Sequence, residues 1–154
     1  LEIEVVESLL LDRSDDILAQ LRQLKMLGIS IDMDDFGTGY SSLGYLWRFP
    51  FDKLKIDQSF MVALENGEPN VSRLLETIVS MAHHLKMKVT TEGVETEAQV
   101  ALMKSLGCDQ LQGYFFGRPM PADKVAAEIL TRFRHNVAET PAAAPSLARA
   151  NHHP

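Results

Sequence analysis

The sequence is poor in cysteine and has no long apolar run. Cys108 is the only cysteine among 154 residues, which excludes an intrachain disulfide and a thiolate metal cluster and fits a reducing, cytoplasmic location. We interpret it as a small residue buried after a helix. A membrane-spanning helix needs about 20 apolar residues. We therefore expect no membrane contact from this segment, although a parent protein could carry an anchor upstream.

Clusters of basic residues are also missing. The chain has 15 Lys and Arg against 21 Asp and Glu, for a formal net charge of −6. Binding to duplex nucleic acid through phosphate neutralisation is therefore not expected. An acidic chain can still bind a phosphate ester if bound cations reverse the local charge. The first residue, Leu1, lies within an apparent strand, so we expect further sequence upstream of it.

Apolar patterning and capping residues predict alternating strands and helices. The predicted strands are 1–6, 29–33, 53–56, 88–91 and 111–115. The predicted helices are 15–27, 41–48, 71–85, 97–106 and 121–134, with Ser14, Asn70 and Thr96 as N-caps and Gly28 as one C-terminal stop. This alternation implies parallel strands with helical crossovers, in an open α/β sheet or a (β/α)₈ barrel. Residues 135–154, rich in Ala and Pro, are predicted to be a disordered tail.

Acidic or amide side chains occur at the end of almost every predicted strand. They are Glu4, Glu7, Asp34, Asp35, Asp57, Glu92, Glu95 and Gln112. The carboxyl ends of parallel strands share one rim, so these groups should converge. Carboxylate oxygens are ligands for Mg²⁺, Mn²⁺ or Ca²⁺. The alternative is a series of solvated turns in which the acids cap helices, but this explains one or two such acids better than a whole set.

One lysine, Lys55, interrupts an apolar strand between Leu54 and Ile56. Its neighbours should face the opposite side of the sheet, and a lysine pointing into a barrel lumen needs carboxylate partners. The alternative is an edge-strand lysine that faces water. With two divalent ions, such a rim would support metal-assisted hydrolysis at a phosphoryl group, with a carboxylate accepting the proton of the attacking water.

Five segments of the chain carry distinctive motifs. From the N-terminus they are Glu4-Val5-Val6-Glu7-Ser8, Asp34-Asp35-Phe36-Gly37-Thr38-Gly39-Tyr40-Ser41-Ser42-Leu43, Leu54-Lys55-Ile56-Asp57, Glu92-Gly93-Val94-Glu95-Thr96, and Gln112-Gly113-Tyr114 followed by Gly117-Arg118-Pro119. In this order they resemble the motifs of EAL domains, the bacterial cyclic-di-GMP phosphodiesterases, and the longest resembles the signature loop of that family. The resemblance covers residues 1–134, the C-terminal part of such a domain. It implies an α/β fold, a partial (β/α)₈ TIM-type barrel with about the last five β/α units, followed by the disordered tail.

The resemblance also implies a role for each matching residue. Glu4, Asp34 and Asp35 correspond to ligands of two Mg²⁺ or Mn²⁺ ions, and Asp57 lies by the same metal centre. Glu92 corresponds to the general base or to an organiser of the attacking water, and Lys55 to the lysine that holds this water or a phosphate oxygen. The remaining matches are two polar site residues, Glu95 and Gln112, and Glu7, which anchors the Asp-Asp loop and is linked to homodimerisation. The implied reaction converts cyclic-di-GMP to linear pGpG.

Some features depart from the family pattern. The Glu-Ala-Leu motif and an asparagine ligand are not in this chain, so this segment alone is not expected to be active. A nonhydrolytic cyclic-di-GMP receptor, or a degenerate module for protein interaction, stays open for the parent. Asp32 stands where a small or apolar residue is usual and shares a strand face with Asp34. A third interpretation, the phospho-acceptor pocket of receiver domains, fits poorly because Lys55 lies within its strand.

Overall fold

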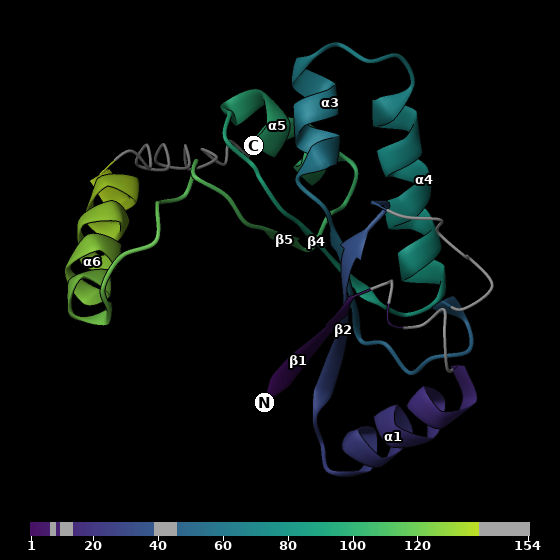
Figure 1. Ribbon diagram of the computed structural model, residues 1–154. Coiled ribbons are helices and arrows are strands. Elements are labelled where there is room, and N and C mark those ends of the chain that lie inside the picture. The colour runs from purple at the N-terminus through teal and green to yellow at the C-terminus, as the bar shows by residue number, and fades with distance from the viewer. Residues whose placement is uncertain (7–8, 10–13, 39–45, 139–154) are drawn as a thin grey trace, which may run out of the picture. The chain divides into compact units, whose positions relative to one another are not determined.

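The computed structural model describes residues 1–6, 9, 14–38 and 46–138. The chain divides into two compact units, Leu1–Arg118 and Pro119–Pro154. The described part of the second unit contains helix α6 (Ala122–Ala138). Every other element belongs to the first unit (Figure 1). No helix among the described residues is both long enough and apolar enough to cross a membrane.

The first unit is built on a five-stranded sheet whose strands lie in sequence order. Its strands are β1 (Glu2–Val6), β2 (Ser30–Phe36), β3 (Lys53–Ile56), β4 (Lys88–Thr91) and β5 (Gln110–Leu111). Every neighbouring pair is parallel. Over the described residues the sheet is open, with β1 and β5 at its edges. Five parallel strands in sequence order form part of a (β/α)₈ barrel wall, as the sequence predicts.

Four helices accompany this sheet. They are α1 (Ser14–Met26), α3 (Ser59–Glu65), α4 (Val71–His84) and α5 (Glu97–Ser105). Helices α3 and α4 lie side by side (Figure 1). The apolar faces of the strands and helices meet in one core, in which Ile31, Leu54, Leu75, Val89 and Met103 have no exposed surface. Burial of this set is the main stabilising contribution and holds the strand ends in place.

Aspartates tie the beginnings of the strands together. Asp109, just before β5, accepts the Val89 N–H at 2.8 Å and lies 2.9 Å from His83 Nε2. Burial alone would raise the pKa of Asp109, but the bonds from His83 and Val89 outweigh burial and hold this pKa below its ordinary value. Asp52, just before β3, accepts the Ile31 N–H in the same way, at 2.8 Å. These contacts fix the register of the strands at their N-terminal ends, opposite to the carboxyl ends where the predicted site residues lie.

Some predicted boundaries and caps are confirmed. Thr96 caps α5 in a reciprocal arrangement with the side chain of Gln99, which is a capping box. Asn70 is the N-cap residue of α4, as predicted, but its side chain makes no capping bond. Its backbone has φ 69°, a conformation that Asn tolerates better than most residues, and its carbonyl accepts the Leu74 N–H.

Other elements differ from the prediction in extent. Strand β2 continues to Phe36 and so includes both aspartates of the Asp-Asp pair. The strand predicted at 111–115 covers only Gln110–Leu111, because the chain turns at Gly113, where a Cβ would collide with the Val94 backbone. Helix α3 was not predicted, and α6 continues past 134 to Ala138, so residues 135–138 are helical. Most of the helix predicted at 41–48, and the tail from 139 onward, lie outside the described residues.

Candidate functional site

A bulge in β2 brings two consecutive carboxylates together. The pairing of β2 with β3 is regular as far as Met33 and Leu54, and it resumes with Phe36 opposite Ile56. One more residue therefore lies on β2 than on β3 across this interval. In a regular strand, consecutive side chains point to opposite faces. The extra residue, together with the positive φ of 56° at Asp35, breaks this alternation at the rim.

Asp34, Asp35 and Glu92 form one carboxylate cluster. Each offers an oxygen, and these oxygens all lie within 4.8 Å of one another. Glu92 comes directly after β4, where its N–H donates to the Ile56 carbonyl at 3.0 Å. All three residues are half-buried. The convergence predicted for the strand ends is therefore present for these three acids, which come from two strands far apart in sequence.

This cluster fits a divalent cation. It offers only carboxylate oxygens, the hard ligands that Mg²⁺ and Mn²⁺ prefer. One of them, Oδ1 of Asp34, is buried, and its close contact with the charged Lys55 nitrogen, at 2.8 Å, uses only part of the bonding capacity of a carboxylate oxygen. A buried oxygen with unfilled bonding capacity beside two other carboxylates is the environment in which a bound cation is favourable.

Lys55 lies in the middle of the acidic residues. Its ammonium nitrogen is 2.7 Å from Glu4, 2.8 Å from Asp34 and 2.8 Å from Glu92. Burial would lower the pKa of Lys55, but the bonds to Asp34, Glu4 and Glu92 outweigh burial and raise this pKa above its ordinary value. With 9% of its side chain exposed, Lys55 is a buried lysine paired with carboxylates. The edge-strand alternative is therefore wrong.

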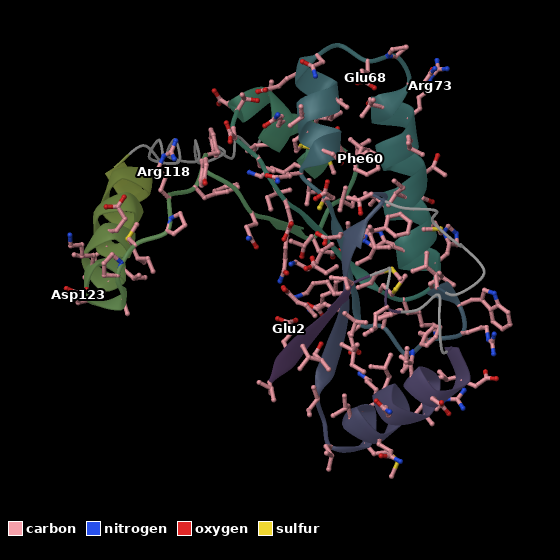
Figure 2. The ribbon with its side chains drawn as sticks, in the orientation of Figure 1. Glu2, Phe60, Glu68, Arg73, Arg118 and Asp123 are labelled. Atoms are coloured by element: carbon pink, nitrogen blue, oxygen red, sulfur yellow. The ribbon has the colours of Figure 1, made fainter. Side chains whose placement is uncertain are left out.

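A second ionic layer lies two residues earlier on the same strands. Lys53 pairs with Glu2 at 2.5 Å and with Asp32 at 3.0 Å; Glu2 is labelled in Figure 2. Burial raises the pKa of Asp32 in spite of the opposing effect of Lys53. Among the described residues, the side chain of Asp32 thus forms its ion pair with Lys53 and not with the lysine of the rim.

The other predicted ligands lie close to this cluster but outside it. Glu4 contacts Lys55 with one oxygen, and 53% of its side chain is exposed. Asp57 follows β3, and its Oδ1 accepts the Ser59 N–H at 2.9 Å, which starts α3. Neither belongs to the group of three oxygens within 4.8 Å, so their ligand roles stay predictions. Glu7 lies outside the described residues.

A hollow of about 230 Å³ adjoins Glu92. Among its lining residues are Glu95 and Gln112, as well as Gln58 and Tyr114, which the sequence analysis did not select. The sequence offered one signal for each of them, because Gln58 directly follows Asp57 and Tyr114 lies two residues after Gln112. Glu92 itself lines this hollow, so the carboxylate cluster opens onto a polar space. A larger hollow beside Trp47 is lined by α4 and by none of the three clustered acids.

Comparison with known proteins agrees with this geometry. The family model described as EAL domain matches residues 1–119. The chain belongs to the EAL domain family. It is 44% identical over 127 residues to the bifunctional diguanylate cyclase/cyclic di-GMP phosphodiesterase MucR of Pseudomonas aeruginosa, and 41% identical over 138 residues to the cyclic di-GMP phosphodiesterase NbdA of the same organism. These matches cover 82% and 90% of this chain, but only 18% and 17% of the two relatives.

Solved EAL structures have the same fold. The complex of the MucR phosphodiesterase with c-di-GMP superposes with a TM-score of 0.76 at 45% identity, over 81% of this chain and 50% of that one. A manganese/cy-diGMP complex of Klebsiella pneumoniae BlrP1 gives a TM-score of 0.68 at 31% identity, over 77% of this chain and 30% of that one. The chain therefore corresponds to part of an EAL barrel.

Proposed function

We propose that this chain is the C-terminal part of an EAL domain that hydrolyses cyclic-di-GMP to linear pGpG with divalent cations. The observation that carries the proposal is the meeting of Asp34, Asp35 and Glu92 within 4.8 Å, with Lys55 bonded to two of them. The relatives named as cyclic di-GMP phosphodiesterases support the substrate.

In this proposal the carboxylates hold two ions, Mg²⁺ or Mn²⁺. Asp34 and Asp35 contribute oxygens from the bulge, and Glu4 and Asp57 complete the set from the neighbouring strands. Bound ions would lower the pKa of a coordinated water and neutralise charge on the phosphodiester. The BlrP1 structure is a manganese/cy-diGMP complex, which supports a divalent cation in the proposed reaction.

The chain's own residues would position the substrate and move the proton. Glu92 accepts the proton of the attacking water, whose oxygen forms a bond to phosphorus. The bond from phosphorus to the ribose 3′ oxygen breaks, and this oxygen takes up a proton, which leaves one 5′-phosphate in the linear product. Lys55 donates to a phosphate oxygen, and its raised pKa keeps it charged for that task. Glu95 and Gln112 contact the nucleotide from the adjoining hollow.

The test is turnover by the full-length protein that contains this chain. Incubation with cyclic-di-GMP and Mg²⁺ or Mn²⁺, followed by chromatography, should yield pGpG. Glu92→Gln should abolish turnover, while Glu97→Gln, on the exposed first turn of α5, should leave it unchanged. Tight binding of cyclic-di-GMP without turnover by the unsubstituted protein would favour the nonhydrolytic receptor. Full turnover by Glu92→Gln would contradict the role of Glu92.

The proposal includes a cytoplasmic homodimer. A cytoplasmic location is supported by the single cysteine of the chain. The dimer rests on the family resemblance, in which Glu7 anchors the loop after Asp35. Sedimentation of the full-length protein should give twice the monomer mass, and a monomer that retains full turnover would contradict this part.

A further inference from the structure

Two glycines at the rim have no space for a side chain. Gly37 comes directly after the bulged strand, and Gly93 comes directly after Glu92; their φ angles are +98° and +69°. A Cβ at Gly37 would lie 2.7 Å from Cζ of Phe60, and a Cβ at Gly93 would lie 2.5 Å from Cβ of Gln58. Both obstructing residues belong to the start of α3, so this one helical turn touches the loops on either side of it.

The start of α3 is itself held firmly. The Asp57 carboxylate accepts the Ser59 N–H, and Met61 is 1% exposed in the core. The Gln99 side chain donates to the Met61 carbonyl at 3.3 Å, and the same side chain completes the capping box of α5. This helical turn is therefore tied to β3, to the core and to α5. A loop that rests on it has a fixed support.

Phe60 supplies the support on the side of Asp34 and Asp35. Its ring is partly buried against the core, while Gly37, over which it lies, is exposed. The ring is labelled in Figure 2, on α3. Replacing it with a methyl group would leave Gly37 without this contact, at the point where the chain leaves the bulge.

We propose that Phe60 is a positioning residue that holds the Asp34–Asp35 segment at the correct distance from Glu92 for cation binding. Phe60 acts through the backbone of Gly37, and Gln58 holds Gly93 from the same helical turn. The proposal rests on the proposed function only in that the cluster binds divalent cations. Removal of outer-shell groups that hydrogen-bond metal ligands typically lowers metal affinity by about 10- to 100-fold. Because Phe60 acts only by packing on Gly37, we expect the lower end of this range.

The test measures Mn²⁺ binding to the full-length protein by calorimetry and by electron paramagnetic resonance of the free ion. Phe60→Ala should weaken binding roughly 10-fold, and Phe60→Leu should weaken it less while preserving the fold. The matched control is Leu64→Ala, one turn further along α3 and also partly buried against the core. It should lower thermal stability and leave Mn²⁺ affinity unchanged.

A double-mutant cycle tests the contact itself. Gly37→Ala alone should weaken Mn²⁺ binding, because its Cβ would collide with the ring. In the Phe60→Ala background, Gly37→Ala should lower Mn²⁺ affinity by a smaller factor, because the ring that the new Cβ would meet is absent. Strictly additive effects, or unchanged affinity in both Phe60 variants, would overturn the proposal, as would an equal loss of affinity in Leu64→Ala.

Activity measurements separate this inference from the proposed function. In Phe60→Ala, turnover should fall at limiting Mn²⁺ and recover at saturating Mn²⁺, with KM for cyclic-di-GMP unchanged. A protein that binds Mn²⁺ through Phe60-dependent geometry but does not hydrolyse cyclic-di-GMP would refute the proposed function alone. Hydrolysis with an unaltered Mn²⁺ requirement in the Phe60 variants would refute only the positioning role. A protein that binds no Mn²⁺ would refute both.

Discussion

Replacement of Lys55 by Met is the sharpest probe of the acidic rim. The change removes the cation shared by Glu4, Asp34 and Glu92 and leaves three carboxylates facing one another. Breaking a buried ion pair by removing one partner costs about 3–5 kcal/mol. Because more than half of the Glu4 side chain is exposed, we expect the lower end, about 3 kcal/mol of unfolding free energy.

Divalent cations should reverse much of this loss. A ligand that binds only the folded state stabilises it by about 2.7 kcal/mol at 100 times its dissociation constant. In Lys55→Met the cation meets carboxylates that no longer have a lysine partner, so the variant should gain more from Mn²⁺ than the unsubstituted protein does. The difference in stability between the two proteins should therefore shrink to about 1 kcal/mol or less at saturating Mn²⁺.

The assay is urea unfolding of the full-length protein with and without Mn²⁺. With a slope of about 2 kcal/mol per M, a loss of 3 kcal/mol moves the midpoint by roughly 1.5 M. The matched control is Lys53→Met, which removes the lysine of the second ionic layer, where Lys53 pairs with Glu2 and Asp32. It should destabilise to a similar degree without rescue by Mn²⁺. If Mn²⁺ restored the stability of both variants equally, or of neither, the cation site would not be the cluster around Lys55.

Three smaller changes test the supporting structure. Asp109→Asn should lose about 1 kcal/mol at neutral pH, since its pair with His83 is partly exposed. The folded-state pKa of Asp109 is lowered, so its contribution to the free energy of unfolding is present above the ordinary Asp value of 3.8 and disappears as the pH falls through the folded value. The variant lacks this carboxylate and should therefore lose less stability on acidification, as measured by thermal unfolding across pH. Thr96→Ala should cost about 1 kcal/mol in urea unfolding through loss of the α5 cap. Leu54→Ala should cost about 3 kcal/mol in the same assay, because Leu54 is fully buried.

The features of the fold that could be predicted are those with a local signal. Strand β3 is predictable because an apolar run surrounds Lys55, and period-2 geometry then places this lysine on the face opposite its neighbours, where Glu4, Asp34 and Glu92 lie. Helix α5 is predictable because Thr96 and Gln99 form a capping box within four residues. The convergence of Asp34 and Glu92 followed from the parallel order of the strands alone.

The features that could not be predicted depend on contacts between distant segments. The bulge at Asp34 and Asp35 exists only relative to β3, because it is a difference in residue count between two paired strands. Helix α3 has seven residues, too few for a helical period to stand out from its apolar sequence. Strand β5 ends early because Gly113 packs on the backbone at Val94, a contact that no local pattern contains.

In the proposed function, Lys55 and a divalent cation would share the same oxygens, and the charge of the lysine explains how so acidic a rim can fold without the ion. Asp34 and Glu92 belong both to the lysine's partners and to the carboxylate cluster. Without a positive charge between them, half-buried carboxylates at this distance would repel one another strongly. The lysine supplies that charge before any ion binds, while Asp35 stays outside its ion pairs among the described residues. The rim is thereby kept assembled, with one oxygen-rich side left for a cation.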